Sequence, residues 1–339
     1  MLRVLAVTGG KQVPSSIFRI RQYFKIVESD DEILLHEATP IMSCYTSYKG
    51  VVRLFYYVFY IIFRLPLLFR QFNYDVIWLQ RELVPTFYTL ERFIIKPLVY
   101  DVDDAVYLGN RNAKTQERIS QRSSFVVVST NYLATWYSRY SKTRVIPTVV
   151  DCDRYKKMQV VSDQMYLGWI GTSNNFWHLD YIQRSLSQFL EENLNWKLKI
   201  VSDRPYTSEY IHASKIEFVQ WSLSIDVQVI NSFNIGLMPL VDTEWTRGKA
   251  SFKLIQYMAC GVHAVASITG NNHYVGRDLP SVKLVQDPNW LPELNFLAQN
   301  LNQIDTRPAI QHVRKHFHVR PNYYLLKEIF YEVYNISRS

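Results

Sequence analysis

The sequence is poor in cysteine. Only Cys44, Cys152 and Cys260 occur among 339 residues, and they lie far apart. An odd and widely spaced set argues against a disulfide framework and against a cysteine-based zinc site. It is typical of a protein kept in a reducing compartment, so we predict a cytoplasmic location. The chain also opens without the long apolar segment and small-residue cleavage site of a signal peptide, because residues 2–8 form only a short β-rich run.

Long uncharged hydrophobic runs are also scarce. The strongest membrane candidate, residues 54–63 (LFYYVFYIIF), has ten uncharged residues between Arg53 and Arg64. A helix needs about 20 such residues to cross a ~30 Å hydrocarbon layer, and Pro66 is expected to interrupt this helix. We therefore predict that the run does not span a membrane. Two alternatives stay open: a helix lying in the plane of a membrane, and a buried helix between strands.

Positive charge is unevenly distributed. Residues 1–160 carry 22 Lys and Arg against 14 Asp and Glu, whereas the rest of the chain carries 16 of each. With the aromatic run, this excess fits an anionic membrane surface bound by the N-terminal half. It also leaves nucleic-acid binding open as a less favoured alternative, since the basic residues are dispersed and no known nucleic-acid module occurs. With 48% hydrophobic and 20% charged residues, the chain can bury a proper core.

Strands and helices alternate along the chain. A strand, a small-residue turn and a helix occur twice, with Gly9, Gly10 and Lys11 in the first turn and Gly171 and Thr172 in the second. This alternation predicts an α/β protein with parallel sheets and helices on both faces. We expect two Rossmann-like doubly wound domains facing a central cleft, with ligands at the carboxyl ends of the strands. The expected boundaries are residues 1–158, 159–318 and a C-terminal helix at 319–339.

The most informative stretch is 237–267. A helix predicted at residues 252–259 follows Gly248 and ends at Gly261, a typical left-handed stop. A helix start offers outward N–H groups and a positive dipole end, which suit a diphosphate. Arg247, Lys249 and Lys253 add positive charge there. The alternative is an ordinary solvated helix start.

Several short motifs, taken in order, carry a resemblance. They are YDVDDA at 100–105, VIWLQREL at 76–83, NYLA at 131–134 followed by IPT at 146–148, LGWIGT at 167–172, and the helix ending in YMACG at 257–261. Together they resemble one bacterial branch of the family 4 glycosyltransferases, which have the two-domain GT-B fold. The resemblance covers most of the chain and implies that the C-terminal helix at 319–339 crosses back to the first domain. It implies a retaining transferase that moves a sugar from a nucleotide-diphosphate sugar to a saccharide or lipid-linked saccharide acceptor.

The resemblance also implies roles for particular residues. Many members carry two glutamates, one near the donor sugar and one on the ribose; here Gly248 and Gln256 occupy those positions. Gln256 retains hydrogen-bonding atoms for a ribose, and Glu244 or Asp242 is a candidate for the sugar side. The donor-binding candidates are Gly9, Gly10, Lys11, Gly171, Thr172, Arg247, Gly248, Ser251, Phe252, Lys253 and Gln256.

The catalytic candidates are Asp103, Asp104, Glu244 and Lys249. The paired carboxylates Asp103 and Asp104 stand where the family often has a sugar-side histidine, and they are suited to bind sugar hydroxyls or accept a proton. Helix capping is the alternative, and for Arg81 and Glu82, which follow the preceding strand, the alternative is a structural ion pair. The Asp101–Asp103 pair also forms a D-x-D motif. We nevertheless expect no metal, because Lys and Arg at the phosphate site offset the leaving-group charge.

The expected role is in bacterial surface polysaccharide or glycan synthesis, at a cytoplasmic or peripheral membrane location. The main alternative is a catalytically degenerate GT-B scaffold, since the sugar-side glutamate is missing.

Overall fold

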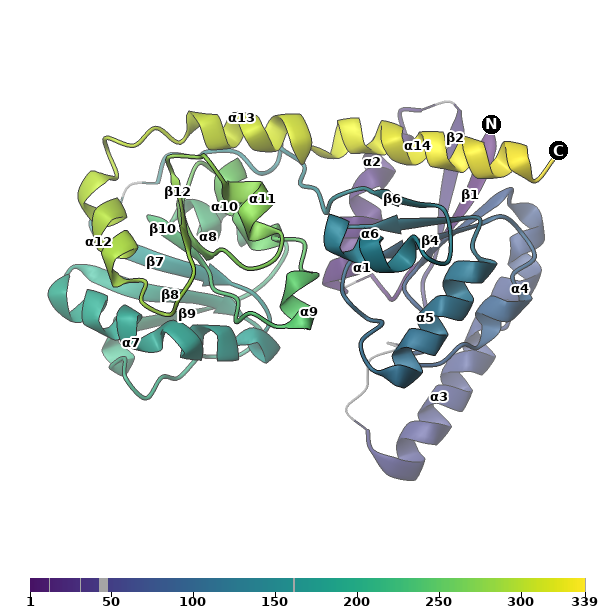
Figure 1. Cartoon of the computed structure of the whole chain (residues 1–339), viewed down its shortest axis with the longest axis horizontal. Helices are drawn as coiled ribbons and strands as arrows, with labels where there is room; N and C mark the ends of the chain where they lie inside the picture. The colour runs from purple at the N-terminus through teal and green to yellow at the C-terminus, as the bar shows by residue number, and fades with distance from the viewer. Residues whose placement is uncertain (12, 31, 43–47, 161, 339) are drawn as a thin grey trace. The chain divides into compact units, whose positions relative to one another are not determined.

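The computed structural model describes residues 1–11, 13–30, 32–42, 48–160 and 162–338. It divides into two compact units: the first unit, Met1–Val149 with Val319–Ser339, and the second unit, Val150–His318 (Figure 1). Residues 150–158, which the sequence assigned to the first domain, belong to the second unit because Val150 donates to the Phe317 carbonyl and Tyr155 to Asp226. Cys44 lies outside the described residues.

The first unit contains a six-stranded sheet whose strands all pair in parallel. The strands are β1 (Leu2–Val7), β2 (Ile33–Ala38), β3 (Val76–Gln80), β4 (Leu98–Val102), β5 (Phe125–Val128) and β6 (Thr143–Val145), in the order β2-β1-β3-β4-β5-β6. β3, β4 and β5 are buried along their full length, as expected for a parallel sheet covered on both faces. The strand order reverses between β1 and β3, which is the switch point of this sheet.

Helices cover both faces of that sheet. They are α1 (Pro14–Arg19), η1 (Arg21–Tyr23), α2 (Phe24–Val27), α3 (Gly50–Arg64), α4 (Pro66–Arg70), η2 (Gln71–Asn73), η3 (Leu90–Phe93), α5 (Asn110–Arg122), α6 (Asn131–Tyr137) and α14 (Val319–Ile336). Helix α14, drawn yellow in Figure 1, packs on the first unit, where the Phe330 ring contacts Trp78 with 5.4 Å between centroids. The last segment of the chain therefore completes the core of the first unit.

The second unit contains a second parallel six-stranded sheet. Its strands are β7 (Met165–Ile170), β8 (Trp196–Ser202), β9 (Ile216–Gln220), β10 (Ile235–Met238), β11 (His263–Ser267) and β12 (Val282–Val285), in the order β12-β11-β10-β7-β8-β9. This is the strand order of a Rossmann sheet, with the switch point between β7 and β10. Gly236 keeps β10 open to the Tyr257 ring, because a Cβ at Gly236 would lie 2.5 Å from that ring.

The helices of the second unit alternate with these strands. They are η4 (Ser173–Asn175), α7 (Trp177–Glu192), η5 (Ala213–Lys215), α8 (Asp226–Asn231), α9 (Glu244–Arg247), α10 (Phe252–Ala259), α11 (Asn272–Gly276), α12 (Leu291–Asn300) and α13 (Arg307–His316). The predicted bounds of α10 are confirmed. So is the left-handed stop, since Gly261 has φ +66° and the Val262 N–H donates to the Tyr257 carbonyl.

Pro66 interrupts the regular helix as predicted, because α3 ends at Arg64 and Pro66 begins the separate helix α4. Proline is tolerated at that first position because its N–H is not required there. Leu65, between the two helices, nevertheless has helical φ and ψ of −52° and −38°. Gly50–Asn73 therefore continues as one helical run of 24 residues that, by length and composition alone, is sufficient to cross a membrane. The expectation that this segment is too short is overturned.

Candidate functional site

The switch point of the second sheet brings two predicted segments together. β7 and β10 are adjacent and parallel, so the turn at residues 171–173 and the loop at residues 239–251 emerge at the same edge. Loops at such an edge form the ligand site of doubly wound sheets. The edge carries Gly171 and Thr172 from one segment, and Glu244, Arg247, Gly248, Lys249 and Ser251 from the other.

Ser251 stands at the start of α10 in an unusual conformation. Its φ and ψ of 59° and 27° are left-handed, which is strained for a residue other than glycine. Its side chain is buried, and its hydroxyl has no hydrogen-bond partner among the described residues. The Ile255 N–H donates to the Ser251 carbonyl, so the first-turn N–H groups of Phe252 and Lys253 point out of the helix end. A strained turn with an orphaned hydroxyl is suited to an anionic ligand.

Two lysines flank this helix start. The Lys253 ammonium lies 5.3 Å from the centre of the Trp169 ring, and the Lys249 ammonium lies 5.3 Å from that of Trp245. A Cβ added at Gly171 would lie 2.7 Å from the Lys253 Cε. The glycine at the end of β7 therefore makes room for the lysine of α10, which explains physically why these two segments carry these residue types.

His178 belongs to the same edge, although the sequence reasoning did not select it. It lies in the first turn of α7, and its Nδ1 accepts a 3.2 Å hydrogen bond from the Val241 N–H. Burial, with Lys253 and Lys249 nearby, lowers the pKa of His178 to about 3. The ring is therefore neutral with its proton on Nε2, which has no partner among the described residues. What could have identified His178 in the sequence is its position shortly after the small-residue turn at Gly171.

Arg247 and Glu244 are placed differently from the lysines. The Arg247 guanidinium forms two hydrogen bonds of 2.9 and 2.8 Å with the Asp242 carboxylate, and it lowers the pKa of Asp242. Arg247 thus does not present an uncompensated charge, and Asp242 is less suited to the sugar side. Glu244, the first residue of α9, is exposed. Gly248 is the buried C-cap of α9.

Gln256 lies inside the second unit. Its Nε2 donates to the Tyr155 hydroxyl at 3.1 Å, and that hydroxyl donates to Asp226, which also pairs with Arg154. The amide is almost fully buried. Its predicted contact with a ribose stays a prediction, since one of its two amide N–H groups is committed to this network.

The turn after β7 is braced by the next strand. Asp203, just after β8, accepts hydrogen bonds of 2.6 Å from the Ser173 N–H and 2.8 Å from its hydroxyl. Partial burial acts in the opposite direction, but these bonds hold the pKa of Asp203 below its usual value. The Thr172 hydroxyl accepts from Asn175 at 2.8 Å. Both contacts fix the path of the backbone beside Gly171.

The switch point of the first sheet carries the other predicted turn. Gly10 has φ +138°, a backbone conformation that favours glycine. The Gly9 N–H donates to the Ser16 hydroxyl at 3.2 Å, and that hydroxyl donates to Gln80 at 2.7 Å. These bonds connect the end of β1 to the end of β3. Lys11 is exposed at this turn.

Asp103 and Asp104 share one arginine. Arg81, directly after β3, donates from Nε to the Asp103 carboxylate at 2.7 Å and from its terminal nitrogen to Asp104. Arg81 is left-handed with φ 55°, a strained conformation for this residue type. The ion pair predicted as the alternative for Arg81 and Glu82 thus forms, but with Asp103 and Asp104; Glu82 instead accepts from Gln116 at 2.9 Å.

The D-x-D motif is divided between core and edge. Asp101 is buried and accepts two 2.9 Å hydrogen bonds from the Arg19 guanidinium, while Asp103 points to Arg81. The two carboxylates therefore have separate cationic partners. Among the described residues, no group of three or more His, Cys, Asp or Glu side chains is arranged to hold a metal.

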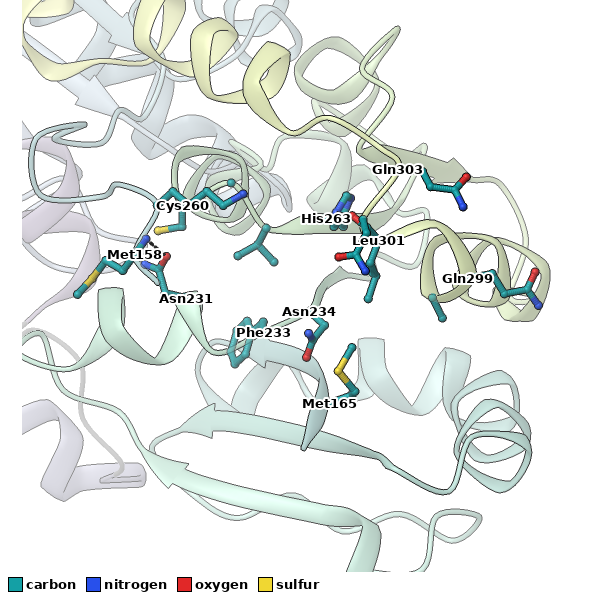
Figure 2. Close-up of a pocket in the computed structure, with 15 residues that line it drawn as sticks. Met158, Met165, Asn231, Phe233, Asn234, Cys260, His263, Gln299, Leu301 and Gln303 are labelled. Carbon is teal, nitrogen blue, oxygen red and sulfur yellow. Dashed lines mark hydrogen bonds between the residues drawn. The ribbon is translucent and has the colours of Figure 1, made fainter. Parts of the chain in front are cut away.

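A cavity of about 550 Å³ in the second unit lies elsewhere (Figure 2). Met165 and His263 open strands β7 and β11, and Asn234 immediately precedes β10, so the cavity lies at the amino ends of these strands. The His263 Nε2 contacts the Leu301 carbonyl at 3.1 Å. None of the predicted site residues lines this cavity, and doubly wound sheets bind their ligands at the opposite edge.

No protein-family model and no curated protein matches this chain in sequence. Solved structures match its fold over nearly the full length. Sucrose-phosphate synthase from Thermosynechococcus elongatus has a TM-score of 0.75 at 12% identity, covering 99% of this chain and 100% of that chain. HepE from Anabaena in complex with UDP and glucose has a TM-score of 0.70 at 13% identity, covering 98% and 100%. A glycosyltransferase from Rickettsia africae has a TM-score of 0.66 at 13% identity and covers 98% of both chains.

These neighbours and the two parallel sheets define the chain as an α/β protein of the GT-B fold, which confirms the predicted fold class. At these identities the likeness concerns the fold. The closer resemblance to one branch of the family 4 glycosyltransferases stays a prediction.

Proposed function

We propose that this protein is a retaining glycosyltransferase of the hexosyl-transferring type. It moves a sugar from a nucleotide-diphosphate sugar to a saccharide or lipid-linked saccharide acceptor, in the synthesis of a bacterial surface polysaccharide or glycan. The observation that carries the proposal is the group of Lys249, Ser251 and Lys253 at the start of α10, at the switch point of a sheet in a GT-B chain.

The chemistry follows from charge. Breaking the bond between sugar and phosphate builds negative charge on the departing diphosphate and positive charge on the sugar. The Lys249 and Lys253 ammonium groups and the N-terminus of α10 stabilise the diphosphate. The Ser251 hydroxyl and the His178 Nε2–H, both without partners among the described residues, are available as further neutral donors. UDP-glucose is the first donor to test, because the HepE structure contains UDP and glucose.

The first unit is assigned the acceptor. Asp103 and Asp104 bind acceptor hydroxyls, and one of them accepts the proton of the attacking hydroxyl. Arg81 positions both carboxylates. Gly9, Gly10 and Lys11 form a second small-residue turn at the same edge of the sheet, and a glycine turn lets donor phosphates approach the backbone.

Retention of the anomeric configuration is what the resemblance to the family 4 glycosyltransferases implies, and we propose that the acceptor attacks the same face that the diphosphate leaves. Analysis of the anomeric configuration of the product tests this step. With two lysines on the diphosphate, we expect activity to survive a chelator. Activity that disappears with the chelator and returns with Mn²⁺ would contradict metal independence.

A cytoplasmic enzyme at the inner face of the plasma membrane follows from the same proposal. Nucleotide sugars are supplied in the cytoplasm, and a lipid-linked acceptor lies in the membrane.

The decisive experiment is a thermal-shift screen of the full chain against UDP, GDP, ADP, CMP and TDP sugars, followed by a transfer assay with the donor that stabilises it. A bound donor raises the melting temperature by mass action. The shift should be lost in Lys253→Met and kept in Lys156→Met, which removes an exposed lysine elsewhere in the second unit. If no nucleotide sugar shifts the melting temperature, the proposal is wrong.

A catalytically inactive GT-B scaffold is the second candidate. It is favoured by Gly248 and Gln256, which replace the two glutamates of many family members. Donor binding without any hydrolysis or transfer would identify this case.

A further inference from the structure

Helix α3 buries its polar side and exposes its apolar side. The side chains it buries are polar or carry polar ends: Tyr57, Tyr60 and Arg64. Its outward face is apolar, and eight of its apolar side chains are between 45% and 67% exposed: Val51, Val52, Leu54, Phe55, Val58, Phe59, Ile62 and Phe63. An ordinary surface helix of a globular protein has the opposite arrangement. An exposed apolar face of this kind marks an interaction site.

Arg64 holds the helix on the first unit. Its guanidinium is buried and donates to the Thr8 carbonyl at 2.6 Å, the Ala38 carbonyl at 3.2 Å and the Tyr60 hydroxyl at 3.2 Å. Thr8 directly follows β1, and Ala38 is the last residue of β2. A buried guanidinium with these partners fixes which face of α3 points outward, since removing it from them would leave a buried charge uncompensated.

The apolar face continues beyond α3. Phe69 in α4 and Phe72 in η2 are 76% and 57% exposed. Gln71 accepts from the Ile95 N–H at 2.8 Å and donates to the Phe93 carbonyl at 3.2 Å. These bonds place Phe93 and Ile95, both exposed, beside the end of the helical run. We call the outward face of α3 together with these four residues the anchor surface.

A basic groove adjoins the anchor surface. It has a volume of about 250 Å³, and Arg111, Lys114 and Arg118 of α5 line it with the loop at residues 86–88. Phe87 connects the two features, because its ring lies 6.4 Å from that of Tyr57 in α3 and 4.2 Å from the Arg111 guanidinium. Figure 1 shows α5 alongside α3 in the first unit. We call this feature the basic groove.

Along the helical run, charge has one sign. The sequence contains no Asp or Glu between Glu37 and Asp75, whereas Lys49, Arg53 and Arg70 are exposed along the helical run. In the part of the chain that the structure describes, no carboxylate pairs with Arg111, Lys114 or Arg118. Apolar side chains flanked by uncompensated cations are the pattern of a helix that lies on an anionic membrane.

We propose that the anchor surface lies in the plane of an anionic phospholipid membrane, with its apolar side chains among the acyl chains, and that the basic groove takes a phosphate headgroup. The inference goes beyond the sugar transfer proposed above and needs neither donor nor acceptor. The helical run is long enough to span a membrane, but its buried Arg64 is hydrogen-bonded to the first unit, which keeps the run on the surface. The one-sided cationic flank favours lipid over a second copy of this chain, whose identical cations would repel.

The test is flotation of the full-length protein with vesicles of phosphatidylcholine alone and with about 30% phosphatidylglycerol added. We expect strong binding to the anionic vesicles and weak binding to the neutral ones. Arg111→Ala/Lys114→Ala/Arg118→Ala should bind the anionic vesicles about 100-fold more weakly and leave neutral binding unchanged. Phe55→Ser/Phe59→Ser/Phe63→Ser should bind both kinds about 10-fold or more weakly.

Matched controls are available in the second unit. Leu194→Ser/Tyr274→Ser removes two side chains that are 82% and 67% exposed, and Lys156→Ala/Lys315→Ala removes two exposed charges. Neither control should reduce binding. All these positions are exposed, so circular dichroism should report an unchanged fold in every variant.

Three outcomes would overturn the proposal. Wild-type protein that stays unbound on anionic vesicles excludes the lipid, and a dimer that the phenylalanine variant makes monomeric then identifies a second copy as the occupant. Binding that neither set of variants weakens identifies another surface. Protein that resists alkaline carbonate extraction identifies a membrane span. A thermal shift with a nucleotide sugar is read separately, so failure of this inference leaves the proposed transferase intact.

Discussion

The charged and polar groups at the switch points of the two sheets differ. In the second unit, two lysines flank a strained serine and a neutral histidine, and the Ser251 hydroxyl and His178 Nε2 have no partner among the described residues. In the first unit, the two arginines are compensated within the protein, since Arg81 pairs with Asp103 and Asp104 and Arg19 pairs with Asp101, while Lys11 is exposed at the glycine turn. The edge of the second unit is therefore suited to bind an anionic ligand. The edge of the first unit presents carboxylates that already pair with a guanidinium.

This difference explains the division of labour that we propose. An edge with unsatisfied donors gains free energy when a diphosphate binds, because buried polar groups without partners are costly. An edge whose charges are already paired binds neutral hydroxyls without a change in net charge. Accordingly, we propose that the edge of the second unit stabilises the leaving diphosphate and that the edge of the first unit binds the acceptor hydroxyls.

The largest expected effect is at Lys253. Lys253→Met keeps most of the packing against Trp169 and Gly171 but removes the ammonium group. We expect kcat/KM for the donor to fall about 100- to 1000-fold, as for the loss of one group that stabilises developing negative charge. Steady-state kinetics measures it, with Lys156→Met as the control. An unchanged kcat/KM would show that the charge difference between the two edges does not explain donor binding.

A smaller effect is expected at Arg81. In Arg81→Met the two carboxylates lose their shared partner, so Asp103 and Asp104 lose their orientation. We expect transfer to fall about 10- to 100-fold, as for a misplaced reacting group, while the thermal shift with donor stays at the wild-type value. Arg81→Lys should restore only part of the activity, because an ammonium lacks the planar fork. Loss of donor binding in Arg81→Met would mean that both edges serve the donor.

His178 makes stability depend on pH. Its pKa in the folded protein is about 3, whereas an unfolded chain has a value of about 6.5. Between these values the unfolded chain binds a proton that the folded chain does not, so acid lowers stability. The slope is up to about 1.4 kcal/mol per pH unit.

Urea unfolding of wild-type protein and His178→Gln between pH 7 and pH 4 measures this contribution. Burial also lowers the pKa of His263, which remains in both proteins, so the difference between them isolates His178. Parallel pH profiles for the two proteins would show that His178 is not held neutral.

The smallest effect is expected at Gly171. A Cβ there would meet the flexible end of Lys253 at 2.7 Å and the buried Trp169 ring at 2.8 Å. The lysine end can move away, but the ring has less room to do so. Gly171→Ala should therefore weaken donor binding by about 10-fold, or about 1.4 kcal/mol, and also lower the melting temperature of the protein without ligand. Isothermal titration and thermal unfolding measure the two effects. Unchanged donor binding with a lowered melting temperature would mean that the glycine serves the packing of Trp169 rather than the lysine.

Much of the fold was readable from short apolar runs. The apolar runs at residues 125–128 and 235–238 predict strands, and β5 and β10 have these bounds because four successive apolar or small residues in each are buried. Three edge elements were missed. β2 contains His36 and Glu37, β12 contains Lys283, and β6 has only three residues. Partly exposed or very short strands lack the continuous apolar signal of central ones.

The candidate site was predicted less completely, for reasons of distance along the chain. Asp101 belongs to the same motif as Asp103, yet its partner Arg19 is 82 residues away, and no local pattern reports that pairing. Arg247 was expected to be available to phosphate, but it pairs with Asp242. His178 has no motif of its own and acquires its neutral state only from burial beside two lysines. Residue type and spacing identified the lysine-flanked helix start, but not which charges the fold compensates.

The Arg64 contacts have one mechanical consequence. Its guanidinium donates to the Thr8 carbonyl, and Thr8 is covalently bonded to Gly9, so no flexible segment separates α3 from the first glycine turn. A tilt of α3 would therefore move that turn as well. On a membrane that holds α3, the distance of the turn from the lipid surface would be fixed by the protein itself.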